Sequence, residues 1–201
     1  MAVIEITQQR PELTQRQRWG HYFVLLFALS SLLIGINLRD SALFATTLYV
    51  NPAAGIRAFY PESWLLDSDG PYVFRVRDMS QIGFKTTIQV STLPVTLNTT
   101  PRNLLDNLIL SRSQTLSAFS VLSRGEPYPL PDDIVATSMR YTFVDDTTSD
   151  PFLERIPVVV EGIDVLTIQG GQAIVITFLA DSAAYDSQFP IFQRFVNDFD
   201  F

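Results

Sequence analysis

The sequence predicts an α+β fold, an antiparallel β-sheet flanked by helices, preceded by a single transmembrane helix. Three observations predict it. An uncharged apolar block occupies residues 19–38, alternating apolar runs recur between 56 and 180, and two later segments have helical periodicity. Strands, a helix, more strands and a final helix are typical of a sheet covered by helices on its two faces.

The apolar block 19–38 lies between Arg18 and Arg39. At about 1.5 Å per residue, a helix over the block is roughly 30 Å long, which matches the hydrocarbon core of a bilayer. We therefore expect a tail at 1–18, a transmembrane helix at 19–38, a linker at 39–45 and one domain at 46–201.

A cleaved signal peptide is the alternative for this block. The candidate cleavage site after Ala45 has Leu43 where a small residue is usual, and Arg39 and Asp40 separate it from the apolar run. These departures favour an uncleaved anchor.

The flanking charges predict the orientation of the anchor. The tail contains Arg10, Arg16 and Arg18, whereas residues 39–55 contain only Arg39 as a basic residue. By the positive-inside rule, the N-terminus is cytoplasmic and the C-terminal domain is periplasmic or extracellular. The protein is expected in the cell membrane.

Four residues of the block are candidate membrane or partner contacts. Trp19 and Tyr22 are typical of the bilayer interface. Ser31 and Gly35 share one helix face and could let another helix approach closely. The alternative is a Ser that bonds to its own helix and a Gly with no partner.

Composition excludes several kinds of chemistry. The chain has no cysteine, and His21, at the edge of the apolar block, is its one histidine. Disulfides, thiol catalysis and a histidine base in the domain are therefore excluded. From residue 46 the chain has ten basic and eighteen acidic residues, a net charge of about −8 that disfavours nucleic acid. We expect no enzymatic activity and no cofactor.

Alternating β-branched and aromatic residues predict the strands of the domain. The predicted strands are 56–60, 72–76, 86–92, 134–144, 156–169 and 172–180. The pair Gly170-Gly171 predicts a hairpin between the last two strands.

Two helices are predicted. Thr100 is a candidate N-cap with Pro101 in the first turn, and a leucine-rich stripe follows. The final helix places Pro190 in its first turn and has one aromatic face, which we interpret as core. The stripe and this face comprise Leu104, Leu105, Leu108 and Ile109, and Phe189, Phe192, Phe195, Val196 and Phe199.

The segment 49–64, YVNPAAGIRAFYPESW, resembles the entry motif of PsbP-type domains, a family named for the extrinsic oxygen-evolving protein of photosystem II. Gly55, Tyr60, Pro61 and Trp64 carry the resemblance. The end of the chain is also similar to the family, at Tyr185, Pro190, Phe192 and Phe199. The resemblance covers about residues 46–201 and implies a PsbP-like α/β/α sandwich that acts by binding or assembly.

Two weaker candidate sites remain. Asp145, Asp146 and Asp150 offer oxygen ligands for a cation, but the segment lacks EF-hand spacing, and a solvated acidic turn is the alternative. The Pro-rich segment 124–131 is expected to be a rigid exposed connection, on which Tyr128 could dock a partner. The alternative there is an ordinary loop.

These observations favour a non-catalytic accessory or assembly subunit of a larger integral membrane protein complex, photosynthetic or respiratory. The alternative is a free-standing, membrane-anchored envelope protein that binds a small molecule or extracellular ligand. A pocket larger than roughly 300 Å³ with convergent polar groups would favour the ligand-binding protein. An exposed apolar patch near the membrane would favour the subunit.

Overall fold

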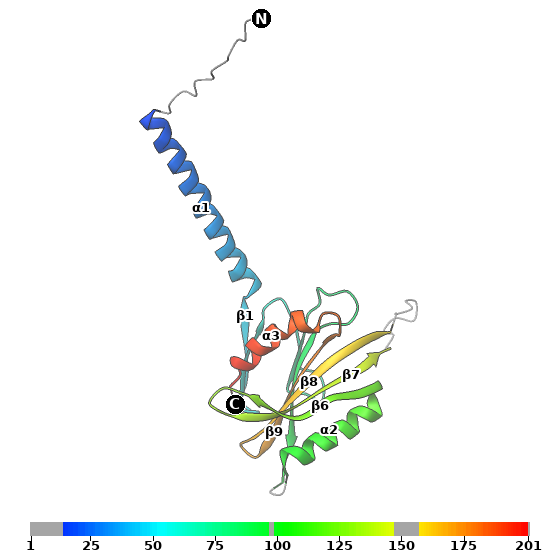
Figure 1. The fold of residues 1–201 in the computed structure, drawn as a ribbon. Helices are drawn as coiled ribbons and strands as arrows, with labels where there is room; N and C mark the ends of the chain where they lie inside the picture. The colour runs from blue at the N-terminus through cyan, green and yellow to red at the C-terminus, as the bar shows by residue number, and fades with distance from the viewer. Residues whose placement is uncertain (1–13, 97–98, 147–156, 201) are drawn as a thin grey trace, which may run out of the picture. The chain divides into compact units, whose positions relative to one another are not determined.

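The computed structural model describes residues 14–96, 99–146 and 157–200. The chain forms two compact units, Met1–Ala45 and Thr46–Phe201, of which the second is the β-rich domain (Figure 1).

The first unit contains one helix, α1 (Gln15–Leu43). Thr14 caps it, and Gln17 bonds back to the Thr14 backbone, so two donors at the helix end are satisfied. Within this unit α1 is unburied, and it is long and apolar enough to cross a membrane. The linker predicted at 39–45 is helical through Leu43, because no Gly or Pro interrupts residues 39–43.

The second unit is built on a seven-stranded antiparallel sheet in the order β3-β4-β5-β9-β8-β7-β6. A separate antiparallel pair, β1-β2, packs beside it. The strands are β1 (Thr46–Asn51), β2 (Ile56–Pro61), β3 (Leu65–Asp67), β4 (Phe74–Arg77), β5 (Thr87–Pro94), β6 (Ser117–Pro129), β7 (Val135–Asp145), β8 (Val158–Gln169) and β9 (Gln172–Asp181).

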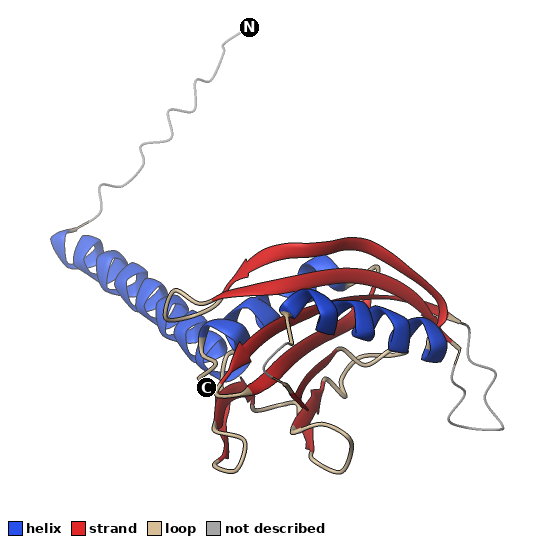
Figure 2. Cartoon of the chain, turned by 90° about the horizontal axis from the view of Figure 1, so that it is seen from below, coloured by secondary structure: helices blue, strands red, loops and turns tan. Residues whose placement is uncertain are grey.

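One helix covers each face of the large sheet (Figure 2). Helix α2 (Pro101–Thr115) packs on β6, β7 and β8, and helix α3 (Tyr185–Asn197) packs on β9 and on β2. The predicted antiparallel sheet with helices on its two faces is therefore confirmed.

Each face has its own core. Under α3, Phe178 of β9 stacks on Phe192 with 5.1 Å between ring centroids, and Trp64 belongs to the same cluster. Under α2, Leu105 packs with buried Tyr141 of β7. Strands β8 and β9 contribute to both cores, which explains their nearly continuous apolar sequences.

Several local predictions are confirmed. Thr100 accepts a hydrogen bond from the Asn103 amide and caps α2. Gly170 and Gly171 both have positive φ, 56° and 78°, and join β8 to β9. This is the backbone that a tight hairpin turn requires, and glycine adopts it without steric cost.

The end of the chain differs from prediction. Helix α3 begins at Tyr185, so Pro190 lies inside the helix rather than in its first turn. Pro190 has no N–H to donate to the Asp186 carbonyl, four residues earlier. Phe199 packs in the core but lies beyond the helix. Burial of the aromatic face outweighs the poor helix propensity at Pro190.

The connection predicted at 124–131 is strand rather than loop for most of its length, because β6 continues to Pro129, while residues 124–127 and 129 are exposed as predicted. This edge strand accommodates its prolines since one side of it has no neighbouring strand in the sheet. Tyr128 is half-buried, with its ring centroid 6.3 Å from that of Phe192. It therefore belongs to the core under α3 rather than to an exposed docking point. Strands β1 and β3 were also not predicted.

Candidate functional site

Asp164 is a fully buried carboxylate near the middle of the sheet. It lies in β8 on the face covered by α2, because side chains alternate along the strand and its neighbours Val160 and Leu166 pack on that face. A buried carboxylate is unfavourable unless it is paired and hydrogen-bonded.

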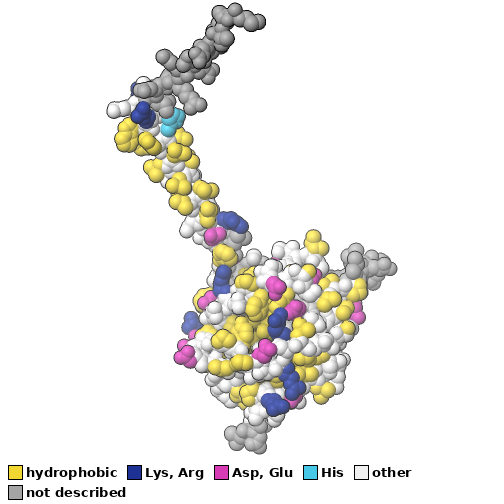
Figure 3. Space-filling model, in the orientation of Figure 1, with side chains coloured by type: hydrophobic (Ala, Val, Ile, Leu, Met, Phe, Trp, Pro, Cys, Tyr) yellow, Lys and Arg dark blue, Asp and Glu magenta, His cyan; other side chains and the backbone are white. Residues whose placement is uncertain are grey.

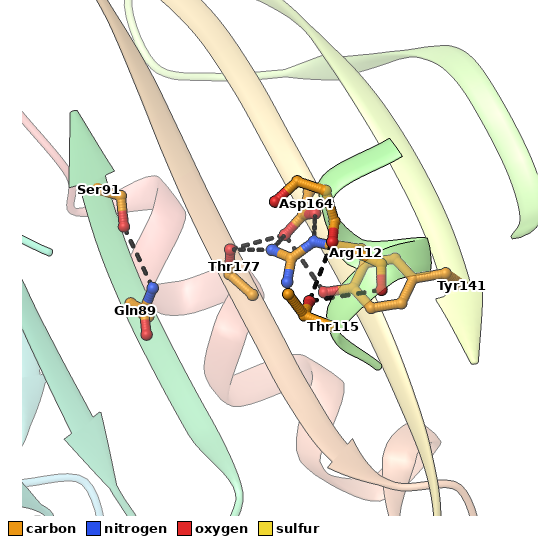
Figure 4. Close-up of polar contacts among 8 residues, drawn as sticks. Gln89, Ser91, Arg112, Thr115, Tyr141, Asp164 and Thr177 are labelled. Carbon is orange, nitrogen blue, oxygen red and sulfur yellow. Dashed lines mark hydrogen bonds and ion pairs between the residues drawn. The ribbon is translucent and has the colours of Figure 1, made fainter. Parts of the chain in front are cut away.

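Arg112 in the last turns of α2 supplies the pairing (Figure 4). Its Nε and one terminal nitrogen donate to the two oxygens of Asp164 at 2.6 and 2.7 Å. The hydroxyl of Thr177 donates to the same carboxylate at 2.6 Å, and that of Tyr141 lies 3.4 Å away. Residues from a helix and three neighbouring strands thus converge on one carboxylate.

The surroundings shift the pKa values of Arg112 and Tyr141. Burial alone would lower the pKa of Arg112, but the charge of Asp164 outweighs it and raises that pKa. Burial raises the pKa of Tyr141 well above its ordinary value, so the phenol stays neutral. Because its oxygens already accept several hydrogen bonds, Asp164 is poorly placed to act as a base. The cluster fastens α2 to the sheet.

A second arginine lies on the opposite face. Arg140 of β7 pairs with Glu161 of β8 at 2.5 Å, and its guanidinium carbon lies 5.3 Å from the ring centroid of Tyr185 in α3. Burial raises the pKa of Tyr185. Arg140 is nearly half exposed, so this contact is expected to stabilise the domain less than the Arg112 pair does.

A cavity of about 470 Å³ lies at the start of α2. Arg102 and Arg124 contribute its positive charge, and Arg124 also pairs with Asp106 at 3.3 Å. The lining residues are Thr100, Pro101, Arg102, Leu105, Arg124, Gly125 and Thr137. The size and charge suit a small anion.

An exposed apolar face lies on β1 and β2. Leu48 and Phe59 are directly opposite in the register, and both remain well exposed, at 42% and 39%. Val50 is 48% exposed and pairs with Arg57. The other sides of these strands pack into the core, because Ile56, Ala58 and Tyr60 alternate inward. We call Leu48, Val50 and Phe59 the hairpin patch.

The predicted membrane contacts lie along α1. Trp19 and Tyr22 are exposed neighbours, with ring centroids 6.3 Å apart. Ser31 and Gly35 are exposed, and a Cβ at Gly35 would meet nothing within 4 Å. Figure 3 shows hydrophobic side chains along most of this helix. The role of Ser31 and Gly35 in helix association stays a prediction, as does the place of Trp19 and Tyr22 at the bilayer interface.

The motif of the resemblance has a structural role. Gly55 has a φ of 67° in the turn between β1 and β2, and Pro61 ends β2. The Pro61 carbonyl accepts a hydrogen bond from the Trp64 amide, and Tyr60 and Trp64 are buried. These residues position the β1-β2 sheet on the core, so the motif has a structural role in the fold.

The predicted cation site is only partly described. Asp146 accepts a hydrogen bond from Ser117 at 3.1 Å, and Asp145 ends β7. Asp150 lies outside the described residues. Within the described ranges, no three carboxylate or histidine side chains are grouped so that they could hold a metal ion.

The Arg112–Asp164 pair was not predicted from the sequence. The sequence did contain a signal for a buried carboxylate, because Asp164 is an acidic residue inside a long apolar run, and such a run is buried. Its partner is 52 residues away, and no sequence pattern identified Arg112 among the nine arginines of the domain.

Comparisons with known proteins bear on the fold. No family model and no curated protein matches the sequence. The solution structure of cyanobacterial PsbP (CyanoP) from Synechocystis sp. PCC 6803 matches with a TM-score of 0.50 and 12% identity, over 77% of this chain and 91% of that chain. LpqN of Mycobacterium tuberculosis, described as involved in cell envelope biogenesis, matches with a TM-score of 0.50 and 15% identity, over 78% of this chain and 90% of that chain. The domain has a PsbP-like fold.

Proposed function

We propose that this protein is a membrane-anchored, non-catalytic accessory or assembly subunit of a larger membrane protein complex. The proposal starts from a PsbP-like domain that directly follows an apolar helix. Helix α1 stays in the membrane with the N-terminus in the cytoplasm, and the domain lies outside. Protease added to intact cells should therefore remove the domain and spare the N-terminal tail.

The hairpin patch is the observation that carries this proposal. Leu48 is only five residues beyond the end of α1, so this residue of the patch cannot lie more than about 17 Å from the end of an anchoring helix. A contiguous exposed apolar face at that position suits a protein partner embedded in the same membrane. The partner proposed here is an integral membrane protein with an apolar surface outside the bilayer.

The chemistry of the domain supports a binding role over catalysis. The buried carboxylate Asp164 is held by Arg112 and Thr177, and the domain has no histidine or cysteine. One protein of similar fold, LpqN, is described as involved in cell envelope biogenesis, which is compatible with a domain outside the cytoplasm. A photosynthetic or respiratory complex is the host we propose.

Solubilisation of native membranes in mild detergent, followed by size separation and mass spectrometry, tests the proposal. The chain should migrate with a large complex whose subunits are identified in the same fractions. Migration only as a particle of monomer or dimer size would overturn it.

The cavity beside α2 favours a second candidate function, an envelope protein that binds a small anion. Its volume of about 470 Å³ is within the range of ligand sites, and Arg102 and Arg124 provide positive charge. Titration of the purified full chain with inorganic phosphate and with a short dicarboxylate tests this candidate. Binding should be lost in R102Q and R124Q, and retained in R57Q, which changes an arginine outside the cavity.

A further inference from the structure

The loop 78–86, between β4 and β5, is a braced turn with an apolar tip. The Asp78 amide donates to the Thr86 carbonyl at 2.9 Å and closes its base. The Lys85 ammonium donates to the Gln81 carbonyl and closes its upper part. Gly83 has a φ of 87°, which lets the chain reverse there. We call this segment the tip loop.

The tip loop exposes two of its apolar side chains, while Phe84 packs on the core under α2. Ile82 is 100% exposed and Met79 is 49% exposed. Burial of an isoleucine side chain is favourable, and a loop that presents it to water does not gain that stabilisation. Such a side chain can be buried in a lipid bilayer or against a protein partner.

The register places the tip loop at the end of the domain where the chain enters from α1. Thr46, the first residue of β1, pairs with Pro61, whose carbonyl binds the Trp64 amide. Leu65, which follows Trp64 in the chain, pairs with Arg77 at the base of the tip loop. In Figure 1 this loop and the start of β1 lie at the same end of the domain.

The length of the connection limits how far Thr46, the first residue of the domain, can lie from the end of α1. Thr46 follows Leu43 by three residues, at most about 11 Å of extended chain. Residues 39–43 extend the helix about 7 Å beyond the apolar block, which is within the headgroup layer. In an anchored protein, Thr46 therefore lies close to the lipid headgroups, and the tip loop is at the same end of the domain as Thr46.

The charge of the tip loop also suits lipid. Residues 79–85 contain no acidic residue and include Lys85, the one lysine of the chain. The domain as a whole has a net charge of about −8, which would repel an anionic surface. Asp78 at the base of the loop is balanced by Lys85, so the loop has no net charge within an acidic domain.

We propose that the tip loop inserts Ile82 and Met79 into the boundary between headgroups and acyl chains of the bilayer that α1 spans. The inference rests on the anchoring proposed above. One or two apolar side chains suffice, because the tether raises their effective concentration at the surface.

The absence of cysteine allows a direct test with single labels on the full chain. We would introduce S80C in the tip loop, V135C at the opposite end of the sheet and F27C in the middle of α1. Each variant carries an environment-sensitive fluorophore and is reconstituted into vesicles of phosphatidylcholine and phosphatidylglycerol. Lipids with a quencher at headgroup or acyl depth then report the position of each label.

The label at position 80 should be quenched from headgroup depth, and the label at 135 should stay in water. I82D in the S80C background should reduce quenching at position 80 to the level at 135, which excludes insertion driven by the dye. Equal exposure at 80 and 135, with position 27 quenched, overturns the loop contact and leaves the anchor intact. An unquenched label at 27 overturns both proposals.

One further outcome identifies a protein partner instead of lipid. If position 80 is exposed in pure lipid vesicles but becomes shielded when the protein is in native membranes, the tip loop binds a protein. That result would overturn the lipid contact and support a subunit interface at this loop.

Discussion

Arg112 of α2 and Asp164 of β8 form a two-hydrogen-bond ion pair across the interface between helix and sheet, at 2.6 and 2.7 Å. The carboxylate is fully buried and the guanidinium is mostly buried. The guanidinium also lies over Tyr141, with its central carbon 4.9 Å from the ring centroid. This pair joins α2 to the middle of the sheet at one orientation.

Removal of one partner of this pair should strongly destabilise the domain. D164N leaves Arg112 charged beside a neutral amide, and loss of one member of a buried pair costs about 3–5 kcal/mol. Chemical denaturation of the detergent-solubilised full chain, followed by circular dichroism of the sheet, measures the change in free energy of unfolding.

The matched control is the exposed pair of Arg124 with Asp106, whose side chains are each about half exposed. D106N should change the free energy of unfolding by less than about 1 kcal/mol. Equal effects of D164N and D106N would contradict the role of the buried pair.

G162A should destabilise the domain by overpacking. A Cβ at Gly162 would lie 2.7 Å from both a Leu179 methyl carbon and the Tyr141 ring. Leu179 can rotate, but the ring of Tyr141 is held between Arg112 and its own core neighbours. Overpacking of this kind costs about 1–3 kcal/mol. An unfolding midpoint equal to that of the wild type would show that the close approach is not maintained.

Asp67 should make stability depend on pH in the acid range. Hydrogen bonds from Arg75, at 2.6 Å, and from Tyr72, at 2.7 Å, hold the pKa of this carboxyl well below its ordinary value of about 3.9. The native state therefore binds the proton less readily than the unfolded state. The contribution of Asp67 is complete above about pH 4 and is lost as the pH falls through its lowered native value.

Comparison of the wild type with D67N over acid pH isolates this contribution. The wild type should unfold at higher denaturant concentration at about pH 6, and the difference should shrink as the pH falls below about 4. A difference that stays constant over this range would show that the carboxyl of Asp67 has the same pKa in both states.

Charge on the hairpin patch should release the protein from its proposed complex. L48D or F59D places a carboxylate in a face that the partner would desolvate, while the exposed positions keep the fold intact. The fraction of the chain that migrates with the complex should fall several-fold. V135D, at an exposed valine far from the patch, is the control and should assemble normally.

The sequence by itself determined the elements that depend on local chemistry. The apolar block predicted α1, the Thr100-Pro101 cap predicted the start of α2, and Gly170-Gly171 predicted the hairpin of β8 and β9. The motif from Gly55 to Trp64 predicted the PsbP-like fold. Each of these signals lies in neighbouring residues: the period of the apolar residues, the helix cap, or the backbone freedom of glycine. The elements could therefore be predicted without knowledge of contacts between distant parts of the chain.

Tertiary structure decided what depends on register and on the choice of face. Tyr128 was expected on an exposed loop, but pairing of β6 with β7 extends the strand and turns the ring onto Phe192. Arg112 meets Asp164 only because α2 crosses β8 at that residue. Pairing across 52 residues has no local signature, since its energy appears only once both side chains leave water together.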